Sequence, residues 1–212
     1  EGVGSQARQT VHSALKAALE AQDVKLTPTL FACHGFQPSA AQIAASVAGA
    51  VGRKLNVDKL AEGIQAAVDE HLAKSSKLPD GLGRLIETAR KRGMPIAVLT
   101  AVSEEAAQAS LARLGVQGAD VRVFSFPDTS KGFPRADLWA KLAKALGKST
   151  RACLVAADDA GVCKSALAAG AKCVVVPTAL SAHQDFCGAD LILDAWDEIS
   201  PRELLDTVIP VK

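Results

Sequence analysis

The chain has 212 residues, of which 49% are hydrophobic and 22% charged, and this composition is typical of a soluble globular protein with one well-buried core. Its 24 Lys and Arg residues nearly balance its 23 Asp and Glu residues, and no basic stripe forms along the sequence, which argues against nucleic-acid binding. The apolar runs are far shorter than the roughly 20 residues that cross a bilayer, so no membrane span is expected.

The first third of the sequence predicts helices around one short strand. Apolar residues at helical spacing predict a helix over residues 6–21. A β-prone run over residues 29–33, ended by His34-Gly35, predicts the first strand and a loop. Two further helical stripes, over residues 39–51 and 57–72, predict a helical hairpin.

From residue 82 onward, short apolar strands alternate with helices. Helices are expected over residues 82–92, 103–115, 134–146 and 161–169, with a last helix after Ser200-Pro201. Strands are expected over residues 96–100, 121–126, 152–156, 173–176 and 191–193. This alternation predicts an α/β fold, a Rossmann-like parallel sheet with helices on both faces.

These elements predict a core with two additions. An N-terminal helical extension takes residues 1–27, and a small helical cap is inserted over residues 39–77. The α/β core takes the rest, residues 28–38 and 78–212. Ligands of such sheets bind at the carboxyl ends of the strands, so the residues that follow each strand are the candidates for function.

The five cysteines form no Cys-x-x-Cys pair, and their odd number argues against a disulfide framework as well as a zinc knuckle. A reducing compartment is therefore expected. The sequence opens at Glu1 without Met and continues into an Ala-rich segment, which fits a trimmed chain or a mature protein whose targeting peptide was removed. The mitochondrial matrix and the chloroplast stroma are the compartments that fit such removal.

Three motifs stand where strands end or helices begin. Thr100 closes the run Ile96 to Thr100, Lys131 precedes Gly-Phe-Pro, and Asp158-Asp159 precede a helix that ends in Ala-Ala-Gly. In order and separation, these motifs resemble the haloacid-dehalogenase-like (HAD) hydrolase superfamily, in particular its phosphoglycolate-phosphatase-like branch. The resemblance runs from Thr29 to the end and implies a HAD-like core with a cap inserted after the first strand.

In that family the first strand leads into Asp-x-Asp-Gly, whereas this chain reads Phe31-Ala32-Cys33-His34-Gly35. The resemblance places Ala32 where the family has its nucleophile, and a methyl group cannot attack phosphorus. The main anionic ligand of Mg²⁺ is lost as well. The resemblance thus implies no catalytic residue, no cofactor (Mg²⁺ only if the protein were active) and a vestigial site made of Ala32, His34, Thr100, Lys131, Asp158 and Asp159.

Three functions stay open. We favour a catalytically inactive HAD-like domain, a pseudoenzyme, that serves as a structural or regulatory subunit and has other protein subunits as partners. The second is a HAD-type phosphatase of small phosphorylated metabolites. The third is a module that binds a phosphate ligand weakly through Thr100 and Lys131 without cleaving it. Asp158 and Asp159 also have a structural explanation, since acids before a helix stabilise its positive end.

Overall fold

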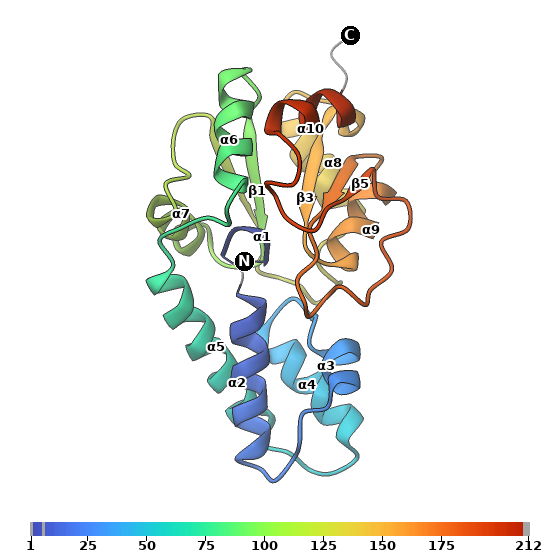
Figure 1. Ribbon diagram of the computed structural model, residues 1–212. Coiled ribbons are helices and arrows are strands. Elements are labelled where there is room, and N and C mark those ends of the chain that lie inside the picture. Colours follow the sequence, from blue (N-terminus) through green and yellow to red (C-terminus); the bar gives the residue numbers. More distant parts are fainter. Residues whose placement is uncertain (1, 6, 210–212) are drawn as a thin grey trace. The chain divides into compact units, whose positions relative to one another are not determined.

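The computed structural model describes residues 2–5 and 7–209, and the chain divides into two compact units (Figure 1). Unit 1 comprises Glu1–Ser5 and Ser76–Lys212, and unit 2 comprises Gln6–Ser75. The chain therefore starts in unit 1, forms the whole of unit 2, and then returns to complete unit 1.

Unit 2 is helical. Its core holds Leu15, Val47 and Leu60, which are fully buried. The longest helix packs against both the first and the third helix of the unit, which explains why it carries apolar residues at helical spacing. The helices that the structure describes in this unit are α2 (Arg8–Glu20), α3 (Pro28–His34), α4 (Ala40–Val51) and α5 (Val57–Lys74).

The strand predicted over residues 29–33 is wrong, because these residues form helix α3. Thr27 is the N-cap of this helix, and its hydroxyl oxygen accepts a hydrogen bond from the Leu30 amide at 3.1 Å. Pro28 stands in the first turn. An N-cap threonine followed by proline is a strong helix start, and a five-residue apolar run alone does not distinguish a strand from a helix.

The units also differ from the predicted domains. Residues 28–38, assigned to the α/β core, lie in unit 2, and so do residues 7–27, assigned to a separate extension. Helix α2 packs against α5 and so belongs to the helical unit. Unit 2 therefore contains four described helices, whereas the sequence predicts a cap of two helices.

Unit 1 holds every strand that the structure describes. The strands are β1 (Ile96–Thr100), β2 (Val121–Ser125), β3 (Leu154–Ala157), β4 (Lys172–Val175) and β5 (Leu191–Ile192). The helices are α1 (Gly2–Ser5), α6 (Leu82–Lys91), α7 (Glu104–Arg113), α8 (Ala136–Ala145), the 3-10 helix η1 (Thr150–Ala152), α9 (Ala160–Ala168) and α10 (Pro201–Val208). Apart from α1 and η1, all of these elements were predicted, with slightly different bounds.

The strands form two parallel sheets, β1-β2 and β3-β4-β5. Alternate residues of β3 and β4 face two separate apolar clusters, as the two-residue period of a strand requires. One cluster packs Val174 against helices α6 and α10, and the other packs Cys173 and Val175 against α9. Helices therefore cover both faces, which confirms the predicted Rossmann-like α/β core. No helix among the described residues is long and apolar enough to span a membrane.

Candidate functional site

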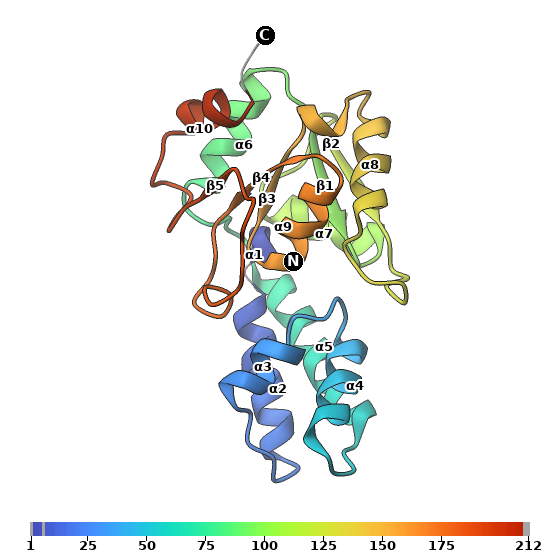
Figure 2. The same cartoon turned by 90° about the vertical axis from the view of Figure 1, so that its right-hand side faces the viewer.

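Two polar side chains lie nearly buried where strands of unit 1 end. Thr100 is the last residue of β1 and is 5% exposed, and Asp158 directly follows β3 and is also 5% exposed. Figures 1 and 2 show the two sheets side by side, with β1 and β3 running in the same direction. Thr100 and Asp158 therefore lie at the same edge of the α/β core, where ligands of such folds bind.

Two hydroxyls fix the turn that follows β1. The Thr100 hydroxyl oxygen accepts a hydrogen bond from the Val102 amide at 3.2 Å, and the Ser125 hydroxyl donates to the Val102 carbonyl at 2.6 Å. Ser103 then caps α7 by accepting from the Ala106 amide. Because the Thr100 hydroxyl oxygen acts as an acceptor in this turn, the same hydroxyl can donate a hydrogen bond to an anion that lies beyond the end of the strand.

Asp159 has a structural role at the start of α9. Its Oδ1 atom accepts a hydrogen bond from the Val162 amide at 3.0 Å, and the Gln184 side chain accepts one from the Ala160 amide at 2.8 Å. The backbone carbonyl of Asp158 accepts a bond of 2.6 Å from the Ser181 hydroxyl. The backbone around Asp158 is therefore held firmly, while the carboxylate of Asp159 is committed to its helix.

Lys131 lies exposed in the loop between β2 and α8. In the same loop, Oδ1 of Asp128 accepts a hydrogen bond from the Ser130 amide at 3.0 Å. The bonds from Ser130, followed by the positive charges of Lys131 and Arg135, hold the pKa of Asp128 below its usual range. The loop therefore combines an ionised acid, Asp128, with two cations, Lys131 and Arg135. Of these two cations, Lys131 is the one predicted from the sequence.

Ala32 and His34 do not lie at the end of a strand. Both are in helix α3 of unit 2, where Nδ1 of His34 lies 2.8 Å from the Ser46 hydroxyl oxygen and forms a hydrogen bond with it. The four other residues of the predicted vestigial site, Thr100, Lys131, Asp158 and Asp159, belong to unit 1. The prediction that Ala32 and His34 replace the two acids of the first motif loses its structural basis.

Two residues of this edge were missed by the sequence analysis. Ser125 is the last residue of β2, as Thr100 is the last residue of β1. The predicted strand ran one residue further, to residue 126, so Ser125 was not identified as a strand-end residue. Ser181 comes from an irregular loop after β4, and no local pattern marks it. Its contact with Asp158 arises only from the folded path of the chain.

A magnesium site does not fit the described residues alone. Among residues 2–5 and 7–209, no group of three or more His, Cys, Asp and Glu side chains is arranged to hold a metal ion. Mg²⁺ is usually bound through one or two carboxylates together with substrate phosphate and water oxygens, and Asp159 already caps α9. Asp158 is therefore the one candidate carboxylate that the described strand ends of β1, β2 and β3 offer.

The buried Cys163 and Cys173 and the half-buried Cys153 of unit 1 are not suited to nucleophilic chemistry. Burial raises the pKa of the Cys153, Cys163 and Cys173 thiols above the usual value. A thiol reacts as its thiolate, so these groups stay protonated and unreactive near neutral pH. Cys153 and Cys173 thus behave as the small core residues expected from their positions in and beside strands.

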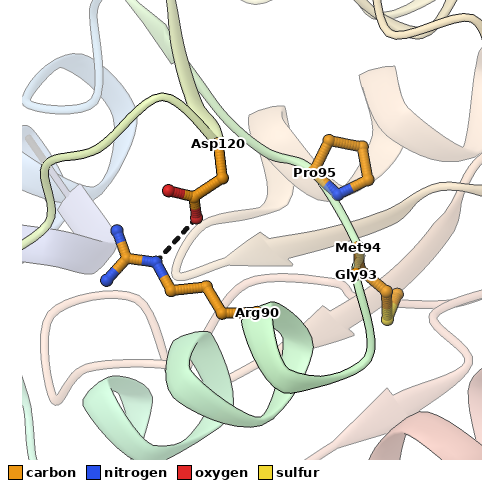
Figure 3. A pocket seen from close by; sticks show the side chains of 5 residues that line it. All are labelled: Arg90, Gly93, Met94, Pro95 and Asp120. Carbon is orange, nitrogen blue, oxygen red and sulfur yellow. Dashed lines mark hydrogen bonds and ion pairs between the residues drawn. The ribbon is translucent and has the colours of Figure 1, made fainter.

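A hollow of about 320 Å³ lies at the opposite edge of the β1-β2 sheet, where both strands begin (Figure 3). Arg90, Gly93, Met94, Pro95 and Asp120 line it. Nε of Arg90 donates to Oδ2 of Asp120 at 2.7 Å, so the charged groups neutralise each other. The hollow is separate from the strand ends that carry Thr100 and Ser125. It lies between the end of α6 and the starts of β1 and β2.

The ion pair in this hollow predicts a pH-dependent contribution to stability. The hydrogen bond from Arg90 lowers the pKa of Asp120 in the folded protein. Because the pKa of Asp120 is lower in the folded protein, the ion pair stabilises the fold at pH values above the unfolded-state pKa of about 3.9. This contribution is lost as the pH falls through the folded-state pKa. We expect Asp120→Asn to lower the melting temperature at pH 7 and to lose its effect in acid. Melting curves from pH 7 downward, with Asp197→Asn as an exposed control, test this; an equal loss at every pH contradicts it.

The sequence has curated relatives, although no protein-family model matches it. It is 29% identical over 131 residues to the CBBY-like protein of Arabidopsis thaliana and 33% identical over 119 residues to protein CbbY of Cupriavidus necator. The matched regions cover 61% and 55% of this chain. They cover 41% and 47% of the relatives, so the match spans less than half the length of each relative.

Solved structures share the fold. CbbY from Rhodobacter sphaeroides, in complex with xylulose-1,5-bisphosphate, has a TM-score of 0.74 and 19% identity, and the match covers 93% of this chain and 92% of that chain. A HAD hydrolase of Entamoeba histolytica has a TM-score of 0.76 and 22% identity, over 98% and 96% of the two chains. The chain therefore has the fold of the HAD-like hydrolases. Its sequence relatives include CbbY proteins.

Proposed function

We propose that unit 1 is the phosphate-binding core of a HAD-type phosphatase that acts on small phosphorylated metabolites. The observation that carries this proposal is the pair of nearly buried polar side chains, Thr100 and Asp158, at the ends of β1 and β3. Their position at the ligand-binding edge of the core makes recognition of a polar ligand their best-supported role.

The charge and hydrogen-bond donors at this edge suit a phosphate group. The Thr100 hydroxyl can donate to a phosphate oxygen, and Lys131 supplies positive charge from the adjoining loop. Backbone amides after β1 and β3 add further donors, as strand-to-helix turns commonly do for anions. Because a relative was solved with xylulose-1,5-bisphosphate, sugar phosphates are the class of substrate that we propose.

The inactive interpretation depended on Ala32 and His34 standing at the nucleophile and general-acid positions. Helix α3 removes that support, so loss of catalytic residues no longer follows from these two positions. Phosphoryl transfer through a covalent intermediate still needs a nucleophile and a separate proton donor. Asp158 can supply only one of these groups, and we therefore propose that residues 1–212 by themselves bind phosphate esters without hydrolysing them.

The compartment and the partners belong to the proposal as well. A plant relative is compatible with the chloroplast stroma. The expected association with other protein subunits stays a prediction, which native co-purification would test.

Phosphate binding is tested by titrating residues 1–212 with inorganic phosphate while amide resonances are followed by NMR. We expect saturable shifts at Thr100, Lys131 and Asp158. Thr100→Val keeps the shape but removes the hydrogen bond to phosphate, worth about 1 kcal/mol, together with the one that the Val102 amide donates within the turn, so the Kd should rise at least about fivefold. Lys131→Met should weaken binding further and reduce its salt dependence.

Lys144→Met, on the exposed face of α8, is the matched control because it removes the same charge elsewhere in unit 1. It should leave the Kd for phosphate unchanged. Absence of saturable shifts at the strand ends in the folded chain would contradict the proposed phosphate site. Equal losses in Lys131→Met and Lys144→Met would mean that only the overall charge matters.

A further inference from the structure

A group of exposed cations lies around the end of helix α8, at the edge of unit 1 where β2 and β3 begin. Arg122 is near the start of β2, and Lys144 is in the last turn of α8. Lys148 follows this helix, and Arg151 is in η1, shortly before β3. All four residues are exposed, and Figure 2 shows α8 on the outer side of unit 1. We call these four residues the α8 cationic patch.

Contacts between three elements bring the members of the patch together. Nη1 of Arg122 donates to the carbonyl of Ala145, the last residue of α8, at 2.8 Å. The Lys148 amide donates to the Ala143 carbonyl at 2.9 Å, which folds the chain back against the end of the helix. Helix η1 contacts α8, so Arg151 belongs to the same surface. The patch is therefore built by the fold from β2, α8 and η1.

The charge of the α8 cationic patch is not neutralised within unit 1. No acid in the described ranges, residues 2–5 and 7–209, forms an ion pair with any of its four members. Other cations at this edge have acidic partners at 2.7 Å, in the pairs Arg90–Asp120, Arg92–Asp206 and Lys172–Asp190. Because like charges that lie close together repel each other, an acidic partner would relieve this repulsion.

Stabilisation of the negative end of α8 does not account for the patch. The last four carbonyls of the helix already accept hydrogen bonds, three from backbone amides and one, that of Ala145, from Arg122. The side chains of Lys144, Lys148 and Arg151 donate to no acceptor within the described part of the chain. A single cation, Arg122, therefore completes the hydrogen bonds of this helix end, and three further cations remain for an external anion.

The surface of α8 beside these cations suits another helix. Ala140 and Ala145 are exposed on α8, and their short side chains let a second backbone approach closely. Lys141 and Lys144 are three residues apart, so they lie next to each other on the helix surface, with about 5–6 Å between their Cβ atoms. Glutamates one turn apart on a partner helix have the same spacing. The geometry of the cations therefore matches a row of carboxylates on a helix.

Membranes and nucleic acids fit this surface less well. Basic helices that bind membranes insert large apolar side chains, whereas the large apolar residue that stands exposed among the described residues, Ile192, is on β5 rather than on α8. Proteins that bind a nucleic-acid duplex commonly contact about 6–10 phosphates, which is more than four cations can neutralise.

We propose that the α8 cationic patch docks a glutamate- or aspartate-rich helix of a protein partner. The partner's carboxylates would accept charge-assisted hydrogen bonds from the lysines and arginines of the patch. Arg122 would keep its bond to the Ala145 carbonyl and offer its remaining N–H groups. The patch lies where strands begin, at the edge of unit 1 opposite to Thr100 and Asp158. Docking therefore goes beyond the proposed phosphate binding and does not depend on it.

A synthetic helical peptide of repeated Glu-Ala-Ala-Ala units is the probe, titrated into residues 1–212 while amide resonances are followed by NMR. We expect saturable shifts at the four members of the patch. A peptide with Gln in place of Glu is uncharged and should not bind. Raising the ionic strength from about 0.01 M to about 0.15 M shortens the Debye length from about 30 Å to about 8 Å and should weaken binding at least about tenfold.

Variants of the chain locate the docking surface. Lys144→Glu combined with Arg151→Glu should lower the affinity for the Glu-containing peptide at least about tenfold, because two attractions become repulsions. Lys144→Arg combined with Arg151→Lys keeps both charges and should retain the affinity. Lys25→Glu reverses an exposed charge in unit 2 and is the matched control, with the affinity unchanged. Circular-dichroism melting curves verify that each variant is folded.

The proposal is overturned if the folded chain shows no saturable shifts at the patch, or if the Glu and Gln peptides bind equally well. An equal loss of affinity in Lys25→Glu would show that only the overall charge matters, and would overturn it as well. Tighter binding of the patch to anionic lipid vesicles or to a DNA duplex than to the Glu-containing peptide would assign this surface to a membrane or to nucleic acid instead.

Discussion

Replacing Leu60 with Ala is expected to unfold unit 2 at a lower temperature while unit 1 remains folded. Leu60 is 0% exposed on α5, the helix that packs against both α2 and α4. Truncating a fully buried leucine costs about 3 kcal/mol, from lost transfer free energy and from the cavity that is left. Because units 1 and 2 have separate cores, this loss should appear in unit 2 alone.

The two tryptophans make this selectivity measurable. The sequence contains only Trp139 and Trp196, and both belong to unit 1. Tryptophan fluorescence therefore follows unit 1, whereas far-UV circular dichroism follows the helices of both units. In Leu60→Ala we expect an earlier circular-dichroism transition together with an unchanged fluorescence transition.

Leu204→Ala is the matched variant in unit 1. Leu204 is 2% exposed on α10 and lies in the same apolar cluster as Trp196. The same truncation should move the fluorescence transition to a lower temperature and leave the circular-dichroism transition of the unit 2 helices unchanged. A single transition that shifts equally in both variants and by both probes would show that the units unfold together.

The α/β part of the fold could be predicted because its signals are local. From Leu82 onward each strand is a short apolar run and each helix has a cap or a terminal glycine nearby, as Ser103 before α7 and Ser200 before α10 illustrate. Alternation of these elements then predicts a parallel sheet without any knowledge of distant contacts.

The error at residues 29–33 has an identifiable cause. Ser200-Pro201 was correctly interpreted as a helix start, but the equivalent Thr27-Pro28 was not. The resemblance to the HAD superfamily requires a strand before the cap, and the best apolar run near the N-terminus was assigned to it. Phe31 in fact packs within unit 2, where its ring meets His12 at 4.7 Å and Phe36 at 5.5 Å.

The candidate site was predictable only in part. Thr100 and Asp158 follow apolar strands, and the position of a strand end is visible in the sequence. Ser181 and Gln184 support the turn at Asp158 from a loop that is distant in sequence, so their contribution depends on the folded path. The division of the strands into two sheets, β1-β2 and β3-β4-β5, was also hidden, because strand pairing is a non-local property.

We expect residues 1–212 to bind phosphate esters without turning them over. Residues 1–212 should show no turnover of p-nitrophenyl phosphate or of sugar phosphates with Mg²⁺ present, because Asp158 alone cannot serve as nucleophile and as proton donor. Phosphate binding, measured in parallel, separates a missing catalytic group from a missing substrate site.

Lys131→Met should weaken the binding of sugar phosphates by residues 1–212 by about tenfold, since a fixed cation attracts the negative charge of the phosphate group. Lys144→Met should retain normal binding, which excludes a general effect of charge. Turnover by residues 1–212 would show that a nucleophile lies among these residues. Tight binding of sugar phosphates without turnover would instead support the inactive interpretation, because the substrate site would then be intact and only the chemistry lost.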